Sequence, residues 1–167
     1  MRFGRIFFIL VLLICTVETM RLWYITPAQM ASHFNAQGDP DASTTKQQFF
    51  NFELQTMLVV IGLGVLTQVF VAITPVEWIN LPNRAYWIAP ERRKQTISLL
   101  GSFAALLFGF ILLTIQAGFE LAVSANLHQP IHFAAESMIV VMGGFVVIAI
   151  LLLVGLTISF RIPPSEA

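Results

Sequence analysis

The stretch SMIVVMGGFVVIAILLLVGLTISF, residues 137–160, contains no charged side chain and decides the fold class of the chain. A helix needs about 20 apolar residues to cross the hydrocarbon core of a bilayer, so this stretch is long enough to do so. Of the 167 residues, 57% are hydrophobic and 11% are charged, whereas about a quarter of the residues in soluble domains are charged. The sequence therefore predicts a protein whose main solvent is lipid.

Three further apolar stretches precede this one, and together they predict an all-α membrane protein formed by one domain, residues 1–167. The four expected transmembrane helices cover residues of about 6–24, 57–79, 97–122 and 133–160. A long outer loop, 25–56, joins the first two, and an inner loop, 80–96, joins the second to the third.

The distribution of cations predicts the orientation of these spans, because Lys and Arg are retained on the cytoplasmic side of a membrane. Of the nine Lys and Arg residues, seven lie on one predicted side: Arg2, Arg5, Arg84, Arg92, Arg93, Lys94 and Arg161. We therefore expect both termini and the inner loop to be cytoplasmic. The cations of the inner loop, Arg84, Arg92, Arg93 and Lys94, are expected to contact anionic lipid headgroups.

The N-terminal segment has the cations and apolar run of a signal sequence, but no small-residue cleavage pattern follows it. We expect it to remain as a signal anchor. The formal net charge is zero, so no basic field attracts nucleic acid. The single cysteine, Cys15, excludes a disulfide within the chain.

Aromatic residues near the predicted span ends are typical of rings that anchor a helix in the membrane interface. They are Trp23 and Tyr24 at the outer side, and Trp78, Tyr86 and Trp87 at the inner side. Within the outer loop, residues 35–41 are dense in turn formers. Thr44 or Thr45, followed three residues later by Gln47 or Gln48, forms a capping-box pattern that predicts a helix continuing into the second span.

Glu18 and Arg21 are three residues apart on the first predicted span, a spacing that places both on one helical face. Ionisable groups in a membrane indicate function by default. Near the end of a span, however, long side chains reach the interface at lower cost. Both a structural ion pair and a transport role remain open here.

A second polar group is predicted at the same side of the membrane, formed by Glu120, His128, His132 and Glu136. His132 and Glu136 are four apart on a predicted helix, so imidazole and carboxylate could face one metal ion, with His33 as a further ligand. An interfacial hydrogen-bond network, a metal or proton site, and unrelated surface positions are the three alternatives.

Gly101, Ala105 and Gly109 repeat every four residues along the third span and predict a strip where another helix approaches closely. Gln68, in the second span, needs a hydrogen-bond partner in lipid. Packing within the four helices or against a foreign subunit would satisfy both requirements.

No phosphate-binding glycine loop, nucleophile arrangement or haem-attachment motif occurs in the sequence. The sequence therefore predicts neither an enzyme nor a bound cofactor.

Two loop segments resemble a bacterial membrane-protein family catalogued as domain of unknown function 1648. The first is His33-Phe34-Asn35 with Gly38-Asp39-Pro40-Asp41 and Lys46, and the second is Asn80-Leu81-Pro82-Asn83 with Tyr86-Trp87 and Ala89-Pro90-Glu91-Arg92-Arg93. The resemblance implies a small multi-span protein of the bacterial cytoplasmic membrane, without a known reaction. The same domain forms the N-terminal part of immunity proteins against a secreted killing factor.

Two functions remain as hypotheses. The first is a non-enzymatic interaction protein that docks another membrane or periplasmic protein through its outer loop and helix faces. The outer-loop residues with this expected role are His33, Asn35, Asp39 and Asp41. The second is a small transporter or a ligand or metal sensor with an outer cavity lined by Glu18, Arg21, Glu120, His132 and Glu136.

Overall fold

The computed structural model describes residues 3–75 and 78–161 of the chain. Its long helices are α1 (Phe3–Ile25), α2 (Lys46–Ile73), α4 (Arg93–Leu127) and α5 (Ala135–Ser159). A short helix, α3 (Arg84–Trp87), and two strands, β1 (Gln29–Phe34) and β2 (Pro40–Thr45), complete the fold. Arg2, residues 76–77 of the second predicted span and the tail after Arg161 lie outside the described residues.

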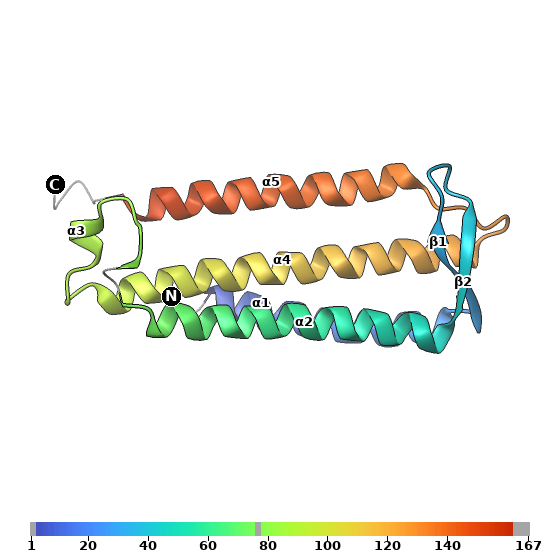
Figure 1. Cartoon of the computed structure of the whole chain (residues 1–167), viewed down its shortest axis with the longest axis horizontal. Helices are drawn as coiled ribbons and strands as arrows, with labels where there is room; N and C mark the ends of the chain where they lie inside the picture. The colour runs from blue at the N-terminus through green and yellow to red at the C-terminus, as the bar shows by residue number, and fades with distance from the viewer. Residues whose placement is uncertain (1–2, 76–77, 162–167) are drawn as a thin grey trace.

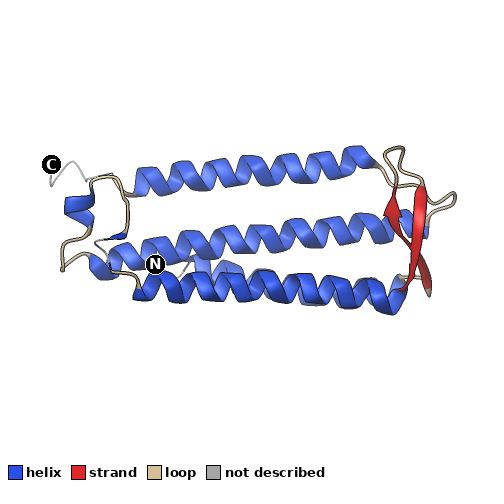
Figure 2. Ribbon diagram, viewed as in Figure 1, coloured by secondary structure: helices blue, strands red, loops and turns tan. Residues whose placement is uncertain are grey.

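The four long helices run side by side along the long axis of the molecule (Figure 1). Each is long and apolar enough to cross a membrane, which confirms the prediction of four helices of this kind. The strands lie at one end of the bundle, called here the hairpin end, and α3 lies at the other (Figure 2). The start of α1 and the end of α5 share the α3 end.

The start of α2 confirms the predicted capping box. Thr45 is the N-cap, its hydroxyl accepts from the backbone N–H of Gln48, and the side chain of Gln48 returns to the backbone of Thr45. The helix ends at Ile73, earlier than the predicted limit at 79, because Pro75 restricts the residue before it to extended conformations. The third helix is longer than predicted and begins at Arg93, beyond Pro90.

The chain is mostly helical, as predicted, but the long loop forms a two-stranded antiparallel hairpin, which the all-α prediction did not include. The turn between the strands holds Gly38 at φ 87°, a conformation that glycine adopts without strain. Asn35 closes this turn, since its side-chain oxygen accepts from the backbone N–H groups of Gln37 and Asp39 at 2.9 and 3.0 Å. The predicted turn-forming segment is therefore the hairpin tip.

Hydrogen bonds dock the hairpin on the ends of the helices. The buried side chain of Asn126, on α4, accepts from the N–H of Ala31 at 2.7 Å and donates to its carbonyl at 3.0 Å. The N–H of Phe133 donates to the carbonyl of Gly38 at 2.8 Å. Lys46 Nζ donates to the carbonyl of Trp23 at 2.7 Å and lies 4.7 Å from the centre of its ring. The hairpin thus ties α1, α2 and the α4–α5 connection together.

The core lies where α4 packs against α1 and α2. Val11 and Cys15 of α1, Met57 of α2 and Leu112 of α4 form one buried cluster along this contact. By contrast, α5 packs beside α4 but buries none of its own residues. The other three long helices therefore all pack along α4, and α5 does so through half-buried side chains only.

At the α3 end, Trp87 does not act as the predicted interfacial anchor. It is 4% exposed and its ring packs edge-to-face on Phe160, with the ring centroids 5.1 Å apart. Its Nε1–H donates to the carbonyl of Phe160 at 2.9 Å, and its own carbonyl accepts from the hydroxyl of Thr96 at 2.7 Å. Trp78, in contrast, is 80% exposed, as an interfacial ring would be.

Candidate functional site

The Glu18–Arg21 pair predicted from the sequence is present near the hairpin end of α1. Arg21 Nε donates to Glu18, and Arg21 also donates to Glu120 of α4 at 2.6 Å. All three side chains are at least one-third exposed. Glu120 is therefore part of an ion-pair triad that links α1 to α4, rather than part of the predicted histidine group.

The polar residues of the hairpin divide into structural and exposed groups. Asn35 is engaged in the turn, as described above. His33 pairs through Nδ1 with Asp41 across the strands, and both side chains are exposed. Asp39 faces His132 of the α4–α5 connection, with 3.5 Å between a carboxylate oxygen and Nδ1. Histidine and carboxylate groups therefore line the tip of the hairpin in two pairs.

The four residues of the predicted metal group do not form one cluster. His132 lies before the start of α5, so the helical four-residue spacing to Glu136 does not apply. His128 Nδ1 lies 2.8 Å from the carbonyl of Ser124. Among residues 3–75 and 78–161, no three His, Cys, Asp or Glu side chains gather in a way that could hold a metal ion.

The small-residue strip of α4 faces the other helices of the chain. Gly101, Ala105 and Gly109 are all buried. A Cβ added to Gly109 would meet the ring of Phe7 at 2.7 Å, and one added to Gly101 would meet the side-chain oxygen of Gln68 at 2.9 Å. The amide of Gln68 donates to the carbonyl of Gly101 at 2.6 Å. Contacts within the chain thus occupy the strip at both glycines.

Two of the predicted headgroup-binding cations face a hollow at the α3 end. Arg93 and Lys94 line it together with Arg5 of α1, and its volume is about 480 Å³. Arg92 instead lies over the ring of Tyr86, 3.9 Å from its centre. Arg84 is the first residue of α3. The basic surface at this end therefore combines residues of α1 and α4. The prediction for the inner loop did not include Arg5 of α1.

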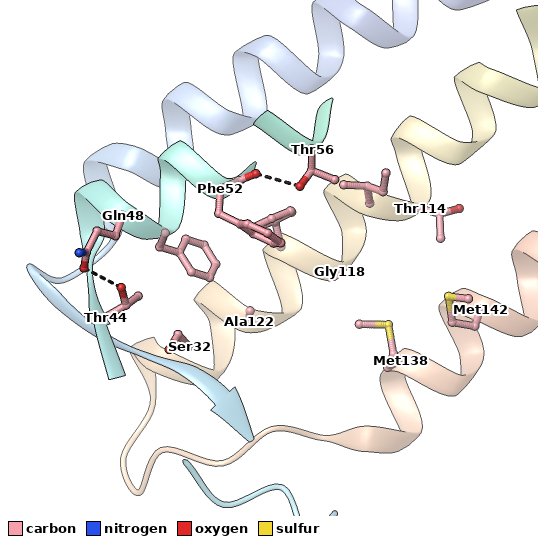
Figure 3. A pocket seen from close by; sticks show the side chains of 13 residues that line it. Ser32, Thr44, Gln48, Phe52, Thr56, Thr114, Gly118, Ala122, Met138 and Met142 are labelled. Atoms are coloured by element: carbon pink, nitrogen blue, oxygen red, sulfur yellow. Dashed lines mark hydrogen bonds between the residues drawn. The ribbon is translucent and has the colours of Figure 1, made fainter. Parts of the chain in front are cut away.

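A larger cavity, of about 620 Å³, lies beneath the hairpin between α2, α4 and α5. Figure 3 shows Phe52 on α2, Gly118 on α4 and Met138 and Met142 on α5 around this space. Ser32 and Thr44 of the hairpin and Gln48 of α2 provide its polar end. We call this cavity the α2–α5 groove.

A second hollow of about 450 Å³ lies between α4 and α5 further from the hairpin, where Val71 of α2 reaches it. The side of α5 that faces α2 is therefore incompletely packed near both of its ends. An unfilled apolar surface between helices can receive lipid or another helix, since both offer the same apolar contacts.

The sequence did not predict a group of three polar residues inside the bundle, of which two are buried and one is half-buried. Glu53 of α2 is 0% exposed and Gln116 of α4 is 5% exposed, and Thr19 of α1 lies between them. The predicted second span began after Glu53, which placed this carboxylate in the loop. Its burial could have been inferred from the spacing of Phe49, Phe50, Glu53 and Met57, which mark one helical face.

The sequence matches no protein-family profile, no curated protein and no solved structure. Function must therefore be inferred from the groove, the hairpin and the polar residues of the chain itself.

Proposed function

We propose that this chain is a non-enzymatic membrane interaction protein. A transmembrane helix of a partner protein occupies the α2–α5 groove, and the exposed His33–Asp41 face of the hairpin contacts the same partner outside the bilayer. The observation that carries the proposal is that α5, although it is apolar from Met138 to Leu156, buries none of its residues. In this proposal the partner completes the packing that the chain leaves open.

Small residues support the entry of a helix at this place. Gly118, on the floor of the groove, has only the end of Met138 within reach of an added Cβ, at 3.4 Å. Gly143, on α5, lines a neighbouring hollow of about 670 Å³ beneath the hairpin and has no atom within 4 Å of an added Cβ. Glycines at a contact allow two helix backbones to approach closely, which increases their van der Waals contact.

Cross-linking in native membranes tests the groove. A photo-reactive residue at Met142, in the groove, is expected to give one defined protein adduct, whereas the same residue at Leu13, on the exposed side of α1, is expected to give lipid adducts. Filling the groove with Gly118→Leu should abolish the protein adduct. Lipid adducts alone at both positions, or an adduct that survives Gly118→Leu, would contradict the proposal.

We also propose that the protein resides in the bacterial cytoplasmic membrane with both termini inside and the hairpin outside. The seven-to-two division of the cations supports this orientation, and the loop segments that resemble the 1648 family support the location. In a Cys15→Ala background, Ser43→Cys should react with a membrane-impermeant maleimide in intact spheroplasts, and Glu91→Cys only after the cells are broken. The reverse pattern would invert the topology.

A small transporter or ligand sensor is the alternative. The exposed ion-pair triad of Glu18, Arg21 and Glu120 does not favour it, because each charge there has a partner. The feature that favours it is Glu53, a carboxylate within a membrane-spanning helix that has no ion-pair partner among the described residues.

A further inference from the structure

Glu53 of α2 lies where α1, α2 and α4 meet, beside polar side chains of the other two helices. The hydroxyl of Thr19, on α1, lies 3.0 Å from Glu53 Oε1 and 3.4 Å from Gln116 Oε1 of α4. Glu53 Oε2 and Gln116 Nε2 are buried, and neither has a hydrogen-bond partner in the described part of the chain. The three side chains form a polar cluster inside an otherwise apolar bundle.

If the carboxylate is ionised, this cluster has fewer hydrogen-bond donors than its accepting oxygens need. A hydroxyl has one hydrogen to donate, whereas a carboxylate and an amide oxygen only accept. If Glu53 is ionised, Thr19 can therefore satisfy only one of its two oxygen neighbours. If Glu53 carries a proton on Oε1, the carboxyl donates to Thr19 and Thr19 donates to Gln116, so that both contacts become hydrogen bonds.

The charges near the cluster support the same protonation state. On α1, Cys15 is a neutral thiol in its usual form, and Glu18 and Arg21 belong to the exposed triad with Glu120 of α4. On α2, Lys46 is bound to the carbonyls of Trp23 and Thr26. No cation of the described chain pairs with Glu53, and an unpaired charge inside a membrane protein is expensive in free energy.

The two ends of an amide are assigned from their contacts, so the amide of Gln116 can also be placed the other way round. Its nitrogen would then donate to the hydroxyl of Thr19, which could donate to Glu53, and the shortage of donors would disappear. That arrangement leaves the carboxylate charge without compensation. Protonation removes both the shortage of donors and the charge.

We propose that Glu53, Thr19 and Gln116 form a proton-binding site, in which Glu53 takes a proton from the aqueous phase and joins α1, α2 and α4 through one chain of hydrogen bonds. Intramembrane carboxyl groups that hold a proton are the groups used in proton relays and proton-coupled transport. The site is separate from the α2–α5 groove, whose lining does not include these three residues.

Infrared spectra of the full chain in lipid vesicles at neutral pH test this site. The wild type is expected to show the C=O stretching band of a protonated carboxyl, shifted in heavy water, and Glu53→Gln is expected to lose it. The control is Glu120→Gln, because Glu120 is paired with Arg21 and should lose a carboxylate band instead. Loss of a carboxylate band in Glu53→Gln would overturn the proposal.

Two further measurements test the hydrogen bond to Thr19 and distinguish a bound proton from a bound sodium ion. Thr19→Val keeps the shape of the side chain and the carboxyl but removes the hydroxyl, so the protonated band should move to higher frequency without being lost. An unchanged band would overturn the hydrogen-bond chain. Exchanging sodium for choline in the buffer should leave the spectrum unchanged. A carboxylate band of Glu53 that depends on sodium would instead identify a cation site.

Discussion

Replacing Trp87 with alanine is expected to lower the free energy of unfolding by about 3–5 kcal/mol, the usual cost of truncating a buried tryptophan. The ring packs against Phe160 and donates a hydrogen bond to its carbonyl. Asn83 donates to the same carbonyl at 2.9 Å. Loss of the ring would therefore leave a cavity and weaken the attachment of the end of α5.

Equilibrium unfolding in detergent micelles, followed by circular dichroism, measures this loss. Trp78→Ala is the matched control, because the same side chain is removed from a position that is 80% exposed, and we expect a change within about 0.5 kcal/mol. Trp87→Phe retains most of the packing but not the donor, and should cost about 1–2 kcal/mol. Equal losses for Trp87→Ala and Trp78→Ala would show that Trp87 is an interfacial ring after all.

Replacing Asn126 with alanine is expected to cost about 2–5 kcal/mol, because it leaves the buried N–H and carbonyl of Ala31 without their partners. Asn126 connects α4 to β1 at the hairpin end. Its loss should therefore release the hairpin before the helices unfold, since the contacts that then hold the tip are made by Gly38 with Phe133 and by Asp39 with His132, both in the α4–α5 connection.

Hydrogen exchange of the Ala31 amide, together with limited proteolysis at residues 35–39, measures this release. Asn51→Ala is the control, because Asn51 is exposed on α2 and accepts a hydrogen bond from the side chain of Gln47 at the surface. Ala31 should exchange faster in Asn126→Ala and at the wild-type rate in Asn51→Ala. Unchanged protection in Asn126→Ala would show that the strands hold themselves in place.

The attachment of the hairpin by Asn126 also affects the proposed partner-binding groove. Ser32 and Thr44 form part of the polar end of the α2–α5 groove. Release of the hairpin would remove these residues from the groove while the helices remain, so the cross-link from Met142 should weaken in Asn126→Ala. The same substitution lies away from Glu53 and should leave its infrared band in place. The two proposed sites can thus be separated by one variant.

The sequence by itself determined the number of membrane spans and the start of α2. Both are local properties. A span requires only that about 20 successive residues be apolar, and the capping box requires only residues Thr45 and Gln48. The pairing of Glu18 with Arg21 is local in the same way, because three-residue spacing on a helix brings two side chains together.

The tertiary structure alone decided which surfaces are buried. In a membrane helix apolar residues occur on every side, so periodicity does not distinguish a face that contacts protein from one that contacts lipid. For this reason the most apolar stretch, residues 137–160, gave no sign that α5 would bury none of its residues. Glu53, Trp87 and the hairpin depend on partners distant in the chain, namely Thr19, Phe160 and Asn126. Such contacts form only when the helices pack.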